Sequence, residues 1–158
     1  MEFELTPDFL TQTLSEAALT AALLQTNALS AEYGLVLSEQ DAKMLAAAGK
    51  EALEIQDRIE FGKSVTVLLI EKFMRSTYLV QTEYAPTLAA LLDVFYQAKE
   101  ECLDILTDEE VLDLMFDFFE RESGGSIELL QSRDLDVLCR KIRYTALGIA
   151  EDEEDLDV

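Results

Sequence analysis

Val65-Thr66-Val67-Leu68-Leu69-Ile70, which follows Ser64, is the stretch on which the fold class depends. Its β-branched residues are typical of a strand, and no other part of the chain has that character. The stretch continues directly into Glu71-Lys72-Phe73-Met74-Arg75, and a lone buried strand would leave its backbone amides without hydrogen-bond partners. We therefore predict a buried helix here and, with it, an all-α protein.

The rest of the chain also favours helices. Its 158 residues include only two prolines and six glycines, while the good helix formers Ala, Leu, Glu and Gln dominate. Apolar residues make up 49% of the chain, which is enough for a full core. The prediction is a compact single-domain helical bundle of about six to seven helices over residues 1–150, with a flexible acidic C-terminal tail over residues 151–158.

Local signals indicate several helix boundaries. The first helix is expected to kink near Asn27. Ser38 and Thr107 each start a capping-box pattern, and Ser132 is expected to cap the last helix. Gly49 lies inside a predicted helix and should weaken it by about 1 kcal/mol relative to alanine.

The charge composition restricts the function. The chain has 33 acidic residues, 12 basic residues and no histidine, so its net charge is −21. Direct binding of nucleic acid or of an anionic membrane surface is not expected, because both need clustered Lys and Arg. The start Met1-Glu2-Phe3-Glu4 lacks a secretory signal, so a cytoplasmic protein is predicted, in which Cys102 and Cys139 stay reduced and buried in the core.

The charge is unevenly distributed along the sequence. Residues 76–132 hold thirteen acids and two bases, whereas residues 133–150 are mildly positive. One hypothesis is a surface that attracts a basic partner, and the simpler one is a solubilising skin, which we favour. Arg140 and Arg143, one helical turn apart, suggest either a small anion site or internal ion pairs, and the ion pairs are favoured.

No catalytic or metal-binding motif is recognisable. Without histidine the chain lacks the commonest metal ligand and general base, and two distant cysteines do not make a zinc site. Neither GxSxG nor a phosphate-binding GK[ST] loop is present. We therefore predict no catalytic, cofactor-binding or metal-binding residue, no cofactor, and a protein that is not an enzyme.

Aromatic residues supply the candidates for a pocket or an interface. Apolar side chains almost surround the helix that contains Phe116 and Phe119, which makes this helix either central in the core, as we favour, or part of a homodimer or partner interface. The candidate set of pocket or interface residues comprises Arg58, Glu60, Tyr78, Tyr84, Tyr96, Phe116 and Phe119.

Several short strings together suggest a family. They are Arg58-Ile59-Glu60-Phe61-Gly62, Tyr84 with Thr87-Leu88, Phe95-Tyr96 with Lys99 and Glu101, Asp108-Glu109, and Gly125-Ser126-Ile127-Glu128-Leu129-Leu130 with Arg133. From about Asn27 to Arg143 the chain resembles a domain-of-unknown-function family of short acidic helical proteins, found in bacteria and mostly in Gram-positive anaerobes. The resemblance implies a stand-alone cytoplasmic bacterial protein and carries no functional residue over.

The leading functional hypothesis is a non-catalytic cytoplasmic protein-interaction module. Its predicted partner is another protein; the negative charge allows this partner to be basic, and a homodimer is a further alternative. One alternative is an acidic nucleic-acid mimic, which would need carboxylates in phosphate-like rows along residues 100–122. The other alternative is a small-ligand binder or an enzyme with an unrecognised carboxylate site, which would need a deep pocket with converging polar groups.

Overall fold

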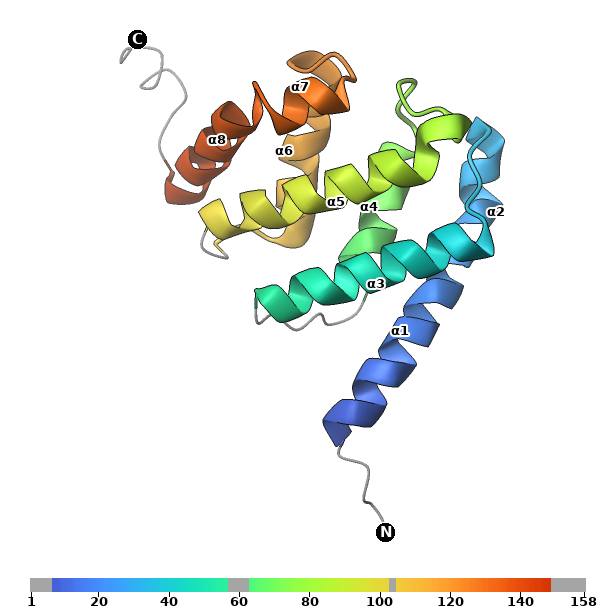
Figure 1. Ribbon diagram of the computed structural model, residues 1–158. Helices are drawn as coiled ribbons and strands as arrows, with labels where there is room; N and C mark the ends of the chain where they lie inside the picture. The colour runs from blue at the N-terminus through green and yellow to red at the C-terminus, as the bar shows by residue number, and fades with distance from the viewer. Residues whose placement is uncertain (1–6, 57–62, 103–104, 149–158) are drawn as a thin grey trace, which may run out of the picture.

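The computed structural model describes residues 7–56, 63–102 and 105–148, and within these ranges every regular element is helical (Figure 1). The predicted all-α fold is therefore confirmed. The α-helices are α1 (Pro7–Gln25), α2 (Asn27–Ser30), α3 (Glu39–Ile55), α4 (Val65–Phe73), α5 (Tyr84–Glu101), α6 (Asp108–Arg121), α7 (Ile127–Gln131) and α8 (Leu135–Leu147). The one-turn α2 follows α1 after a break at Thr26, which agrees with the predicted kink near Asn27. With α1 and α2 counted as one kinked helix, the described residues form seven helices, within the predicted six to seven. Two 3₁₀ turns, η1 (Ala31–Tyr33) and η2 (Gln81–Glu83), precede α3 and α5.

The ambiguous stretch is helix α4, as predicted. The Ser64 side chain begins it by accepting hydrogen bonds from the backbone amides of Thr66, at 3.0 Å, and Val67, at 3.4 Å. The β-branched residues that suggested a strand are buried in the core, with Val65 only 2% and Thr66 only 1% exposed. Tertiary burial of an apolar helix outweighs the small difference in intrinsic preference.

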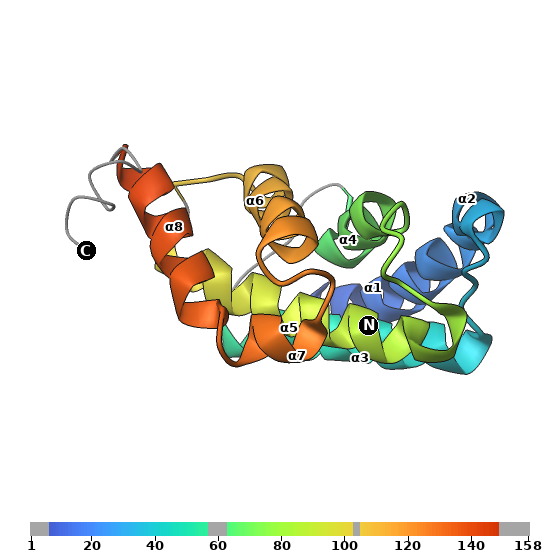
Figure 2. The same cartoon turned by 90° about the horizontal axis from the view of Figure 1, so that it is seen from above.

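The helices form layers around one core. Helices α3 and α5 lie side by side, and α4 and α6 pack on one face of this pair (Figure 2). Helix α1 packs against α3, while α7 and α8 cover the remainder of α5. Phe73, Phe95 and Phe119 are fully buried where these layers meet. None of the described helices combines the length and the apolar character needed to cross a membrane.

Gly49 has a packing role that outweighs its helix propensity. It is buried in α3, and a Cβ atom added there would lie 3.1 Å from Oγ1 of Thr66 on α4. That distance is tighter than an ordinary van der Waals contact. The glycine thus allows α3 to approach α4 closely, at the cost in propensity that the sequence predicts.

Two of the three predicted caps lie at the starts of their helices. Ser38 caps α3, and Thr107 forms a full capping box with Glu110 at the start of α6, so both predictions are confirmed. The prediction for Ser132 was wrong, because this residue ends α7, and its hydroxyl donates to the carbonyl of Glu128 at 2.6 Å. Helix α8 begins only after Asp134, whose carboxylate accepts a hydrogen bond from the Ser123 hydroxyl.

Candidate functional site

A groove of about 530 Å³ lies between α4 and α6 and is open to solvent. We call it the α4–α6 groove. Leu68, Leu112 and Phe116 form its apolar part, and charged side chains surround them. The residues that line the groove are Leu68, Glu71, Lys72, Arg75, Glu109, Leu112, Asp113 and Phe116.

The two helices that form the groove run in the same direction. Lys72 of α4 makes an ion pair with Asp113 of α6. Just beyond the end of α4, the Ser76 hydroxyl donates to Oε2 of Glu120 of α6 at 2.5 Å. Beneath the groove, the Phe73 ring makes edge contacts with Phe116, with centroids 5.2 Å apart. These cross-links give the groove a rigid floor and a defined register.

Most charges in the groove are paired, but two are not. Glu71 pairs with Lys63 at 3.0 Å, and the Lys72 ammonium lies 5.9 Å from the Phe116 ring centroid as well as beside Asp113. Among the described residues, the Arg75 guanidinium and the Glu109 carboxylate have no hydrogen-bond or ion-pair partner. Because Glu109 is one turn before Asp113 and Arg75 follows Lys72, the two charges mark opposite ends of the groove. Lys72 and Asp113 lie at the same level, Arg75 is three residues beyond that level, and Glu109 is four residues before it. The two charges are therefore about seven residues, or about 10 Å, apart along the groove.

Three of the candidate residues from the sequence lie in or near this region. Phe116 is half-buried and lines the groove, whereas Phe119 is 1% exposed and lies in the core below. Tyr78 is 47% exposed, and its ring meets the edge of Phe119 at 6.2 Å and covers Gly125. Helix α6 therefore contributes both to the core and to the groove.

The other candidate residues are not part of the groove. Arg58 and Glu60 lie outside the described residues. Tyr96 is 4% exposed and packs against Phe95, with ring centroids 5.1 Å apart. Tyr84 is 1% exposed, so the three tyrosines have different surroundings rather than one shared pocket wall.

Tyr84 has an unusual hydroxyl. Burial raises its pKa, and the nearby Ser30 side chain acts in the opposite direction. The Tyr84 oxygen nevertheless has no hydrogen-bond partner within the described structure, and the Ser30 hydroxyl donates to the carbonyl of Leu35 at 2.6 Å. This phenol is therefore buried close to the end of α2 with its hydroxyl unsatisfied.

The acidic residues of α6 are largely engaged by partners within the chain. They were the core of the nucleic-acid-mimic hypothesis, which needs a free row of carboxylates. The engaged groups are Asp108 with Lys99, Glu110 in the capping box, Asp113 with Lys72, Asp117 with Arg121, and Glu120 with Ser76. Such pairing interrupts the row that phosphate mimicry requires.

Two basic residues, Arg143 of α8 and Lys99 of α5, also have partners within the chain. Arg143 contacts Glu101 of α5 at 2.6 Å, which agrees with the expected internal ion pairs. Lys99 is 4% exposed, and its ammonium donates to the Leu106 carbonyl at 2.6 Å while pairing with Asp108 at 2.9 Å. These contacts join α5 to the start of α6 and to α8.

No described group has the character of a metal site or a reactive thiol. Among residues 7–56, 63–102 and 105–148, no group of three or more Cys, Asp or Glu side chains is placed to hold a metal ion. Burial and the nearby acids Glu101 and Asp136 raise the pKa of the Cys139 thiol to about 11. A thiol with so high a pKa is a poor nucleophile near neutral pH.

Two amide side chains were missed by the sequence analysis. Asn27 bonds both the amide and the carbonyl of Leu37, at 2.8 and 2.9 Å. Gln81 does the same for Val36, at 2.8 and 3.0 Å, although it lies 45 residues away. The local sequence contains no signal for the second contact, because its partner is brought near only by the fold.

The fold and the groove define a small all-α protein with an acidic surface and an open, partly apolar groove between two parallel helices. The chain belongs to a family of unknown function, DUF6323, which matches residues 22–148. This match confirms the predicted relation to a family of unknown function over most of the chain. No curated protein and no solved structure matches the chain.

Proposed function

We propose that this chain is a non-catalytic protein-interaction module that receives a segment of a partner protein in the α4–α6 groove. The observation that carries the proposal is the apolar floor of the groove between two charges, Arg75 and Glu109, that have no partners in the described structure. The other charges of the groove are paired, but this arginine and this glutamate are free at its opposite ends. Such an arrangement favours a partner that carries complementary charges at the same spacing. In this proposal the module works in the cytoplasm of a bacterium.

The groove also restricts the partner segment. An acidic side chain would meet Arg75, a basic one would meet Glu109, and apolar side chains between them would cover Phe116. On a helix these two charges would be about seven residues apart, the spacing of two turns. The opposite charges at the two ends would then set the direction in which the segment lies.

The observations support a protein partner over the alternatives. A small-ligand or catalytic site is normally concave and encloses its ligand with converging polar groups, whereas this groove is open and its Lys72 and Glu71 already have partners. The interrupted acidic row of α6 weighs against a nucleic-acid mimic.

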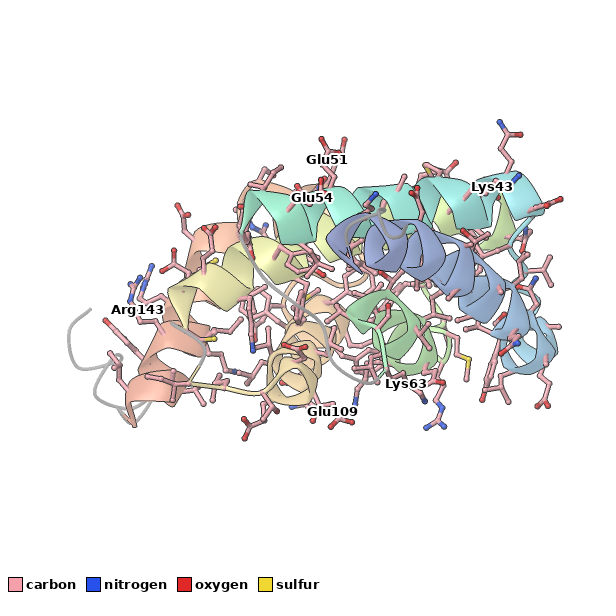
Figure 3. The ribbon with its side chains drawn as sticks, turned by 90° about the horizontal axis from the view of Figure 1, so that it is seen from below. Lys43, Glu51, Glu54, Lys63, Glu109 and Arg143 are labelled. Atoms are coloured by element: carbon pink, nitrogen blue, oxygen red, sulfur yellow. The ribbon has the colours of Figure 1, made fainter. Side chains whose placement is uncertain are left out.

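The test compares two charge-swapped variants that leave the net charge unchanged. R75E/E109K alters the groove, and K43E/E54K alters exposed residues of α3 (Figure 3). Proteins captured from a bacterial lysate by the wild type and by K43E/E54K, but not by R75E/E109K, are then purified and their Kd is measured. We expect at least one such partner, with binding weakened about tenfold or more by the groove swap.

Two results would contradict the proposal. One is that every captured protein binds the two charge-swapped variants equally well. The other is that the chain alone forms a dimer in analytical ultracentrifugation that R75E/E109K abolishes, since the groove would then receive a second copy.

A further inference from the structure

The end of the bundle at α2 carries a second apolar surface, separate from the groove. Four large apolar side chains there are exposed, namely Leu29 at 48%, Tyr33 at 50%, Val36 at 43% and Val80 at 50%. We call these four residues the end patch. Helix α2 and the chain before α5 come together at this end in both Figure 1 and Figure 2.

The chain geometry places these residues on one region of surface. Leu29 and Tyr33 are one helical turn apart along α2 and η1. Val36 follows shortly after the turn at Gly34. The Gln81 side chain holds the backbone of Val36, so its neighbour Val80 lies close to Val36.

The outward direction of Val36 is enforced by its surroundings. Its neighbours Leu35 and Leu37 are 2% and 4% exposed, so in the extended segment that they form Val36 must point outward. Asn27 and Gln81 occupy the amide and carbonyl groups of Leu37 and Val36. The end patch is therefore held rigid in advance, which lowers the entropic cost of binding.

The charges around the end patch are predominantly negative. Glu32 lies between Leu29 and Tyr33 in the sequence, about one turn after Leu29. The Glu83 amide donates to the Val80 carbonyl at 3.1 Å, which keeps Glu83 next to Val80. Neither glutamate has an ion-pair or hydrogen-bond partner for its carboxylate within the described structure. The patch thus combines an apolar centre with free acidic groups at its edge.

We propose that the end patch docks a segment of another protein that presents apolar side chains flanked by Lys or Arg. The basic residues would meet Glu32 and Glu83, and the apolar ones would cover Tyr33, Val36 and Val80. A second copy of this chain is a poor occupant, because it would bring the same two glutamates against each other. The docking site is independent of the α4–α6 groove.

The experiment uses the full chain labelled with ¹⁵N and two synthetic amphipathic peptides of about 18 residues, one of Leu and Lys and one of Leu and Glu in the same helical pattern. We expect the Leu/Lys peptide alone to bind, with NMR shift changes concentrated in residues 29–37 and 79–83. E32K/E83K should weaken this binding about tenfold, because it reverses the attraction at the edge of the patch. L29S/V80S should weaken it without changing the salt dependence.

The matched control is E51K/E54K, which makes the same change of charge on the outer face of α3 (Figure 3). It should leave the Kd within about twofold of the wild type, as should the groove variant R75E/E109K. The proposal is overturned if no binding occurs, if the Leu/Glu peptide binds equally, or if E51K/E54K weakens binding as much as E32K/E83K. Shift changes confined to the groove would also overturn it. Unchanged amide spectra of the free variants establish that they fold.

Discussion

At the scale of single residues, the contact between Gly125 and Tyr78 shows how one position can depend on a distant side chain. Gly125 has a φ of +79°, which favours glycine. A Cβ atom there would also lie 2.0 Å from the Tyr78 ring, which is far inside van der Waals contact. The loop between α4 and α5 can pack against the loop between α6 and α7 at this point because the Tyr78 ring lies over a residue that has no side chain.

Gly125→Ala is expected to destabilise the protein more than Gly34→Ala. The two glycines have nearly the same φ, +79° and +78°, but the space around the added Cβ is open at Gly34. Gly34→Ala should therefore cost only the left-handed backbone penalty of about 1 kcal/mol, and Gly125→Ala that penalty plus displacement of the Tyr78 ring. The free energy of unfolding in urea measures both. Equal losses in the two variants would show that the Tyr78 contact is unimportant.

At the scale of secondary-structure elements, hydrogen bonds at the ends of helices decide where they begin. Thr107 accepts from the Glu110 amide at 3.1 Å, and the Glu110 side chain accepts from the Thr107 amide at 2.8 Å. Ser132 resembles a cap in the sequence, but its hydroxyl donates backward to Glu128. The amide of Asp134 bonds the Leu129 carbonyl at 2.8 Å and closes α7 before α8 can begin.

These contacts predict different effects for two otherwise similar substitutions. Thr107→Ala removes the cap of α6 and should lower the free energy of unfolding by about 1 kcal/mol. Ser132→Ala removes an exposed hydroxyl that caps no helix start, so it should change stability by less than about 0.5 kcal/mol. Urea unfolding of the two variants provides the comparison. A loss at Ser132 as large as that at Thr107 would show that the Ser132 bond to the Glu128 carbonyl stabilises the protein as much as the cap of α6 does.

At the scale of the whole molecule, the net charge of −21 opposes compactness. Ion pairs between exposed side chains, such as Lys43 with Glu39 and Arg121 with Asp117, offset it only weakly. The buried apolar core therefore supplies most of the stability, and repulsion among the carboxylates reduces it.

Added salt should accordingly stabilise this protein. Raising NaCl from about 0.01 M to about 0.15 M shortens the Debye length from about 30 Å to about 8 Å and screens the repulsion. Each kcal/mol gained should raise the Tm by about 2–4 °C in a chain of this length. Thermal unfolding followed by circular dichroism measures the change. E51K/E54K, which is less negative, should respond less, and a Tm that falls with salt would show that attractive pairs dominate.

Much of the fold follows from the sequence by itself. Helix periodicity, the capping residues Ser38 and Thr107, and the sparse glycines and prolines act over a few residues, so they predict the all-α fold and most helix boundaries. The character of α4 also follows, since a single apolar segment without a strand partner has only the helix in which to satisfy its amides. The composition likewise accounts for the acidic surface.

The surfaces that carry the functional proposals were decided only by the tertiary structure. The α4–α6 groove exists because two helices pack in parallel register, which places Arg75 and Glu109 at its two ends. The end patch is rigid because Gln81 reaches Val36 across 45 residues. Contacts between residues so far apart depend on how all the helices pack together, and no local pattern in the chain encodes that arrangement.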